Sequence, residues 1–93
     1  MNFVWDEKKR SINLKKHGLD FVDAEKVFQG AAFTFANDRF FYGEDRWITM
    51  GLLLGMVVVI AHMEDEQAET IRVISLRKAS KNEQKIFFEN LSN

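Results

Sequence analysis

One short segment of the chain combines an apolar run with cationic side chains. Residues 70–80 are mostly β-branched or aliphatic and include neither Gly nor Pro, a composition typical of a β-strand. The segment carries Arg72 early, and Arg77 with Lys78 at its end. A guanidinium group can donate two parallel hydrogen bonds to a phosphate, so Arg77 and Arg72 are the best candidates for binding one. The alternative interpretation is an edge strand whose charges prevent pairing with other chains.

The direction of the side chains decides which of these cations can act together. Successive side chains of a regular strand point to opposite faces. One face of the strand is expected to carry Ile71, Val73, Ser75 and Arg77. The other face is expected to carry Arg72, Ile74, Leu76 and Lys78. Arg72 and Arg77 can reach one site only if the strand bulges or twists. We prefer Arg77, because it stands where the strand ends, a position from which a rigid scaffold often presents chemical groups.

Three residues are candidates for proton transfer, namely His17, His62 and Glu83. Histidine is the side chain whose unperturbed pKa lies closest to neutral. His17 follows a lysine-rich helix end and suits an exposed site, although a contact with the helix C-terminus explains it equally well. His62 ends a buried strand and is as readily interpreted as a hydrogen-bonded core residue. Glu83 fits a helix-capping role with Ser80 better than the role of a base.

The first third of the chain predicts a strand and two helices. Residues 2–5 form a short apolar start. Asp6 can cap a first helix, and Gly18 can end it in the left-handed conformation. Asp20 opens a second helix, in which apolar side chains recur at helical spacing, and Gly30 ends it.

The rest of the chain predicts strands followed by a last helix. Residues 31–36 form a loop or strand, and residues 46–54 and 56–62 form an antiparallel pair with Gly55 in the turn. Residues 80–83 read Ser-Lys-Asn-Glu, the capping-box pattern that begins a helix. The expected fold is α+β, with a small antiparallel sheet, two N-terminal helices and a C-terminal helix, all on one side of the sheet.

Composition limits the class of protein. The chain has 93 residues, 46% of them hydrophobic, and a net charge of −1, which fits one domain spanning residues 1–93. Any basic surface must therefore be local, formed where early and late cations pack side by side. With no Cys and no His pair at metal-ligand spacing, we expect no metal site. With no glycine-rich phosphate loop, we expect no nucleotide cofactor.

One long uncharged stretch raises the question of a membrane. Residues 47–63 contain no Asp, Glu, Lys or Arg and approach the length of a membrane-spanning helix. Two glycines and the β-branched run at 57–60 favour two buried strands instead. Asp6 and Glu7 interrupt the start of the chain, so we expect no secretion signal and a cytoplasmic location.

With these elements placed, the chain resembles the BrnT toxin family along nearly its whole length. The early matches are Trp5-Asp6, Lys9, Asn13 and Lys16-His17-Gly18. The second helix matches at Phe21, Ala24-Glu25 and Val27-Phe28. The later matches are Asp45-Arg46, Gly51, Val57-Val58-Val59, His62, Ile71-Arg72-Val73-Ile74-Ser75, Arg77, Ala79 and Glu83. Each motif is weak alone, and their order along the chain makes the resemblance specific.

The resemblance implies a RelE-like fold and a ribonuclease toxin of a type II toxin–antitoxin pair. It implies a BrnA-like antitoxin with a ribbon-helix-helix DNA-binding part, and a complex that binds its own promoter DNA. The implied substrate is RNA, cleaved by metal-independent acid/base chemistry. The expected catalytic residues are Arg77, His17, Glu83 and Arg46. The expected RNA-binding residues are Lys16, Arg72, Lys78 and Lys9.

Departures from the family pattern leave a second function open. The family often has Glu-Arg followed by Tyr in the last helix, where this chain has Glu83-Gln84 and Phe87. Met63 stands where a Thr often follows the histidine. The alternative is a non-catalytic toxin homologue that only binds an antitoxin or regulates transcription with it.

Aromatic residues are candidates for stacking on RNA bases, and they are Trp5, Trp47, Phe40, Phe41 and Tyr42. Most are expected in the core, because large aromatic side chains dominate burial. The run at 40–42 lies beside charged residues and is an alternative contact for an antitoxin.

Overall fold

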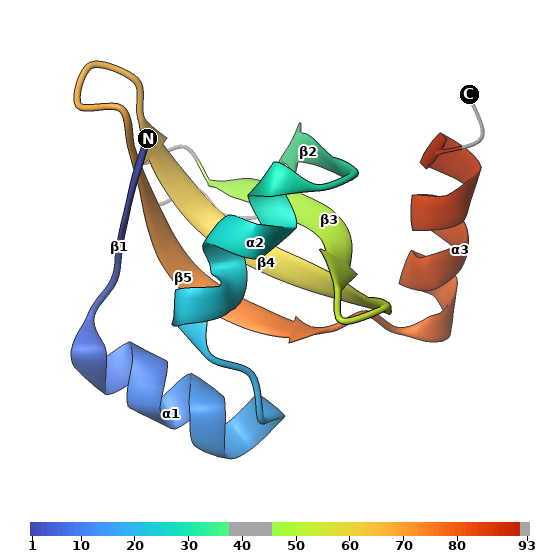
Figure 1. The fold of residues 1–93 in the computed structure, drawn as a ribbon, viewed down its shortest axis with the longest axis horizontal. Coiled ribbons are helices and arrows are strands. Elements are labelled where there is room, and N and C mark those ends of the chain that lie inside the picture. The colour runs from blue at the N-terminus through green and yellow to red at the C-terminus, as the bar shows by residue number, and fades with distance from the viewer. Residues whose placement is uncertain (38–45, 92–93) are drawn as a thin grey trace.

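The computed structural model describes residues 1–37 and 46–91 of the chain (Figure 1). Its strands are β1 (Asn2–Val4), β2 (Ala32–Ala36), β3 (Trp47–Leu53), β4 (Met56–Asp65) and β5 (Thr70–Lys78). Its helices are α1 (Glu7–His17), α2 (Ala24–Gln29) and α3 (Lys81–Leu91), with a 3-10 helix, η1 (Phe21–Asp23), leading into α2. The α+β class and the expected order of elements are confirmed. None of the helices described is long and apolar enough to cross a membrane.

The described strands form one mixed sheet in the order β1-β5-β4-β3-β2. Neighbours from β2 to β5 are antiparallel, whereas β1 pairs with β5 in parallel. The expectation of an antiparallel sheet is therefore wrong at the β1 edge. β1 begins the chain, and its partner comes only after the other strands, so no turn or short loop near β1 indicates the pairing.

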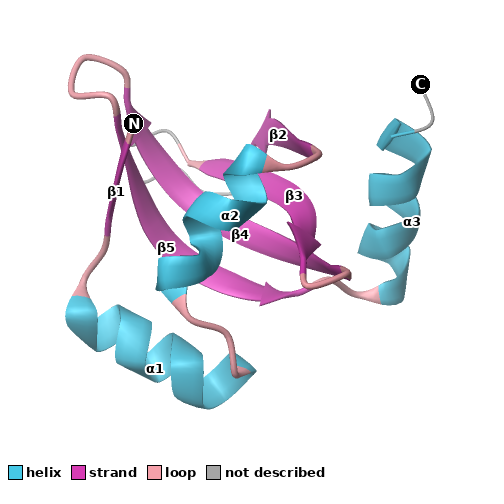
Figure 2. Ribbon diagram, viewed as in Figure 1, coloured by secondary structure: helices cyan, strands magenta, loops and turns pink. Residues whose placement is uncertain are grey.

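Helices cover both faces of the sheet, which corrects the expectation that they lie on one side. α2 crosses the middle of the sheet, and α3 stands at one end of it (Figure 2). Phe21 and Val27 pack with Val58 on what we call the α2 face. Phe87 of α3 packs with Val59 on the opposite face, the α3 face. β4 is apolar on both faces, so each face requires a cover.

A β-bulge in β5 changes the direction of its later side chains. β4 and β5 pair Ala61 with Ser75 but His62 with Val73, which leaves Ile74 without an opposite residue. Because the strand gains one residue here, the side chains that follow are shifted to the other face.

The bulge corrects the expected alternation and brings two arginines to one face. Arg72 and Arg77 oppose Met63 and Val59 of β4 and lie on the α3 face. Lys78 opposes Val58 and lies on the α2 face. The condition under which Arg72 and Arg77 share a face is therefore met.

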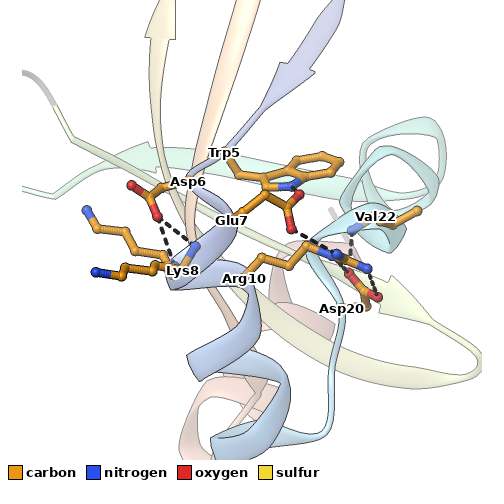
Figure 3. Close-up of polar contacts among 8 residues, drawn as sticks. Trp5, Asp6, Glu7, Lys8, Arg10, Asp20 and Val22 are labelled. Carbon is orange, nitrogen blue, oxygen red and sulfur yellow. Dashed lines mark hydrogen bonds and ion pairs between the residues drawn. The ribbon is translucent and has the colours of Figure 1, made fainter.

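Polar contacts hold α1 in place (Figure 3). The backbone N–H of Lys8 donates to Asp6 Oδ1 at 2.8 Å. Arg10 donates through Nε and Nη2 to the two carboxylate oxygens of Asp20 at 2.7 and 3.0 Å, and these bonds lower the pKa of Asp20. Gly18 ends the helix with a φ of 71°. Both predicted ends of α1 are confirmed.

Asn13 joins α1 to the edge of β5. Its buried side chain donates through Nδ2 to the carbonyl oxygens of Leu76 and Leu19 at 2.8 and 3.1 Å. The Leu76 N–H donates to Asn13 Oδ1 at 3.2 Å. β1 pairs only with residues 70–72 of β5, so Asn13 satisfies backbone groups that β1 does not reach. α1 thereby packs beside the part of β5 that carries Arg77.

Candidate active site

A groove on the α3 face collects side chains from β2 to β5 and from α3. Its volume is about 490 Å³. Its apolar lining residues are Phe35, Ile48, Met50, Val59, Ala61 and Ile86. Its polar lining residues are Asn37, Ser75, Arg77, Asn82 and Glu83. We call it the α3-face groove.

Arg77 and Glu83 form a two-bond ion pair in this groove. Arg77 Nη1 donates to Glu83 Oε1 at 2.7 Å, and Nη2 donates to Oε2 at 2.8 Å. Glu83 Oε1 also accepts the backbone N–H of Ser80 at 2.8 Å, and Ser80 Oγ accepts the N–H of Glu83 at 3.2 Å. The predicted capping box is confirmed, and it fixes the carboxylate against the end of β5.

The ion pair sets the charge state of both groups. Hydrogen bonds from Arg77 lower the pKa of Glu83 to about 2. The carboxylate in turn raises the pKa of Arg77. Glu83 is therefore ionised at neutral pH and accepts a proton poorly while Arg77 holds it. Its geometry suits a residue that positions Arg77.

A second depression gathers the basic residues of α1. Its volume is about 290 Å³, and it is lined by Lys9, Ile12, Asn13, Lys16, His17, Ile74 and Ser75. We call it the α1 hollow. Ser75, next to the bulge of β5, lines both the hollow and the α3-face groove. The early and late segments do lie side by side here, since Lys9 and Lys16 line the hollow with Ile74 and Ser75 of β5. None of the late cations lines the hollow itself.

Three other predicted site residues, Arg72, Arg46 and Lys78, line neither the groove nor the hollow. Arg72 is exposed on the α3 face, nearer the β4–β5 hairpin than Arg77. Arg46 is half-buried, and its carbonyl oxygen accepts the N–H of Asn37, a groove residue, at 2.9 Å. Lys78 is exposed on the α2 face. Among the predicted site residues, Arg77 and Glu83 line the groove, and His17, Lys9 and Lys16 line the hollow.

His62 is a core residue. It is fully buried, Thr49 Oγ1 lies 2.7 Å from its Nε2, and Phe28 packs edge-on against its ring at 5.1 Å. Burial lowers the pKa of His62 to about 4, so the ring is neutral at physiological pH. It opposes Val73 and lies on the α2 face, away from Arg77. Of the two interpretations of His62, the hydrogen-bonded core residue is the correct one.

Of the aromatic residues expected to stack on bases, those that the structure describes do not line the α3-face groove. Trp5 packs edge-on against Phe21, at 6.5 Å, in the core of the α2 face. Trp47 opposes His62 and so lies on the same face. The run at 40–42 lies outside the described residues. The groove aromatic is Phe35, which was not among the aromatic residues predicted to stack. The alternation of residues 32–36 does place Phe33 and Phe35 on one face.

Comparison with known proteins adds an independent observation. Residues 5–83 match the family described as ribonuclease toxin, BrnT, of type II toxin–antitoxin system. A comparison with curated proteins found no match. The family match spans the elements that carry Arg77, Glu83, His17 and the α1 lysines, and membership implies an antitoxin partner. The chain therefore belongs to the BrnT family of ribonuclease toxins of type II toxin–antitoxin systems.

Proposed function

We propose that this chain is itself an endoribonuclease that cleaves RNA by metal-independent acid/base chemistry at the α3-face groove and the α1 hollow. The observation that carries the proposal is that Ser75 lines both depressions. In this proposal the guanidinium of Arg77 and the basic side chains of α1 lie on either side of Ser75 and together bind one RNA strand. An RNA strand needs several cations, because each nucleotide brings a phosphate.

The chemistry assigns a role to each group. The 2′-oxygen of the RNA attacks phosphorus and loses its proton to a base, and the 5′-oxygen leaves with a proton from an acid. His17 is exposed in the α1 hollow. We assign to it the role of the base that takes the 2′-proton, and a water molecule supplies the proton of the leaving 5′-oxygen. Arg77 stabilises the charge that develops on the phosphate oxygens, and Glu83 holds Arg77 in position.

The remaining predicted residues have supporting roles in this proposal. Lys9 and Lys16 bind the RNA backbone in the α1 hollow, and Arg72 extends the cationic surface along β5. Arg46 stays a catalytic candidate because it neighbours Asn37, which lines the groove. Lys78, on the other face, contributes only to the long-range field.

The partner and the setting also belong to the proposal. We propose a RelE-like fold, a cytoplasmic location, and inhibition by a BrnA-like antitoxin with a ribbon-helix-helix part. The complex of the two proteins would bind its own promoter DNA. Family membership supports each of these expectations.

Arg77 and Lys78 provide a matched pair of variants, because they are neighbours on opposite faces of β5. Arg77→Gln is expected to slow RNA cleavage about 10²–10³-fold, as removal of one charge-stabilising donor does elsewhere. Lys78→Gln is expected to cleave at nearly the wild-type rate. Both are measured on purified protein whose circular dichroism matches the wild type and which melts cooperatively above the assay temperature. Undiminished cleavage by folded Arg77→Gln contradicts the role of Arg77.

One observation favours the second candidate, a homologue that binds an antitoxin without cleaving RNA. Both terminal nitrogens of Arg77 already donate to Glu83, which leaves the guanidinium engaged. Expression of the chain alone separates the two functions. Growth arrest with new RNA ends, relieved by the antitoxin, supports the ribonuclease. Normal growth with folded, soluble protein supports the binding protein.

A further inference from the structure

A run of stacked aromatic rings on the α3 face ends inside the groove. Phe87 and Phe33 stack with their ring centroids 6.1 Å apart and their planes at 20°. Phe33 and Phe35 stack in the same manner, at 5.9 Å and 26°. Phe87 is fully buried, whereas Phe35 is 40% exposed and lines the α3-face groove. The ring of Phe35 therefore packs against the core through Phe33 and remains accessible in the groove.

The groups around Phe35 are of three chemical kinds. Ile48, Met50 and Ile86 provide apolar surface. Asn37 and Asn82 carry side-chain amides, and each amide offers both donors and an acceptor. Arg77 provides the cation of the same groove. A nucleobase requires an aromatic or apolar face and amide-like partners at its edge, and its phosphate requires a cation.

We propose that the α3-face groove holds one unstacked base of single-stranded RNA on the ring of Phe35, with an adjacent phosphate at Arg77. This inference rests on the proposed function and names its substrate as single-stranded RNA. In a duplex the bases stay paired and stacked, and their faces are not accessible to a protein ring. The volume of the groove, about 490 Å³, lies in the range of small-ligand sites.

The groove also has a competing occupant, an apolar segment of the antitoxin. The polar side chains of the groove favour RNA, because the edge of a base offers hydrogen-bond partners to the amides of Asn37 and Asn82 and an apolar segment does not. The two occupants differ in what they require of Phe35. A base needs the π face of an aromatic ring, whereas a protein segment needs only apolar area.

The test uses a fluorescein-labelled single-stranded RNA with 2′-O-methyl riboses, which cannot be cleaved through the 2′-oxygen. Binding is followed by fluorescence anisotropy. Phe35→Leu keeps an apolar side chain and removes the ring, and it is expected to weaken binding about tenfold. Phe35→Tyr is expected to bind as the wild type does. Phe88→Leu is the matched control, since Phe88 is 51% exposed on α3 and does not line the groove.

Abasic nucleotides identify the contact as stacking. The abasic position is moved along the oligonucleotide one nucleotide at a time. At one position the wild type is expected to lose about tenfold in affinity, and Phe35→Leu is expected to lose nothing further. Losses that are the same in both proteins at every position overturn the proposal. So does a Phe35→Leu variant that binds RNA as tightly as the wild type.

Salt dependence separates this inference from the proposed function. Phe35→Leu removes no charge, so the slope of log Kd against log salt is expected to stay unchanged. Arg77→Gln is expected to reduce that slope by about 0.7.

If the wild type neither binds nor cleaves RNA, the proposed function fails and the inference fails with it. If the wild type does both and Phe35→Leu does so equally well, the inference alone fails. A Phe35→Leu variant that keeps its RNA affinity and loses the antitoxin identifies the groove as a protein contact and also overturns it.

Discussion

Arg77 and Glu83 are at once a structural ion pair and the charged centre of the candidate site. The carboxylate occupies both terminal nitrogens of the guanidinium, so a phosphate that binds Arg77 must share or displace it. Glu83 is also bound to the first turn of α3 through Ser80. The strand end and the helix start are therefore joined by one side chain.

Glu83→Gln is expected to remove a contribution to the stability of the fold that the wild type loses in acid. Folding lowers the pKa of Glu83 from 4.5 to about 2. A carboxyl with a depressed pKa stabilises the fold above its ordinary pKa, and that contribution is lost as the pH falls from 4.5 toward 2. Because Arg77 is partly exposed, solvent screening limits the contribution to about 1 kcal/mol.

Urea unfolding at about pH 6 and about pH 3 measures this contribution. The wild type is expected to lose more stability between the two pH values than Glu83→Gln loses. The variant removes only one carboxyl, so the other acidic groups act equally in both proteins. An identical pH dependence of the two proteins would contradict the pKa assigned to Glu83.

At the scale of elements, two buried residues, Asn13 and Gly51, set how closely α1 and α2 pack against the sheet. Asn13 fastens α1 to β5 near the bulge. Gly51 permits the close approach of α2 to β3, because a Cβ atom there would lie 2.5 Å from Val27 Cγ1. Both contacts involve residues of the family pattern, and both are buried.

Asn13→Ala is expected to destabilise the fold by about 2–3 kcal/mol, because it leaves the N–H and carbonyl groups of Leu76 without their side-chain partner. Ser11→Ala is the control, since Ser11 is exposed on the same helix, and it is expected to change stability by less than about 0.5 kcal/mol. Chemical unfolding measures both variants. Equal stability of the two would show that the Asn13 bonds contribute little.

Gly51→Ala is expected to destabilise the fold by about 1–3 kcal/mol through overpacking against Val27. The double variant with Val27→Ala tests the cause. Relief of the clash is expected to make the double variant more stable than the sum of the two single changes, by more than about 0.5 kcal/mol. If the stability changes of the two single variants simply add, the destabilisation by Gly51→Ala does not come from the clash with Val27.

At the scale of the whole molecule, a nearly neutral chain separates its charges in space. The net charge is −1. Lys9 and Lys16 lie on α1, beside the later part of β5. Acidic residues lie at the β4–β5 hairpin, which projects from the sheet at the start of β5 (Figure 1). They are Glu64, Asp65, Glu66 and Glu69. The acidic hairpin and the basic α1 hollow thus lie beside opposite ends of β5, and this separation is expected to orient a polyanion toward α1.

Replacing Lys9 and Lys16 together by Gln is expected to lower the salt slope of RNA binding by about 1.4, since each phosphate contact on a single strand contributes about 0.7. Lys26→Gln is the control, because Lys26 is exposed on α2 and paired with Asp23 at 3.4 Å. Anisotropy titrations over a series of salt concentrations measure the slopes. Equal slopes for the double variant and the wild type would contradict the proposal that the α1 hollow binds RNA.

Features that depend on a few neighbouring residues were predicted from the sequence. The cap at Asp6, the left-handed Gly18 and the capping box of Ser80 with Glu83 each satisfy backbone groups within one helical turn. The hairpin of β3 and β4 has the same basis, because strand periodicity and a glycine turn can be read locally. The sequence by itself therefore determined where the helices and most of the strands lie.

Contacts between distant residues decided the rest. The parallel pairing of β1 with β5 and the place of α3 on the opposite face arise from segments far apart in the chain. The bulge at Ile74 arises from pairing with β4 and brings Arg72 to the face of Arg77. Burial beside Thr49 and Phe28 separates His62 from the exposed His17. Only the tertiary structure decided these features, because each follows from the sum of many packing contacts across the chain and not from the pattern of one segment.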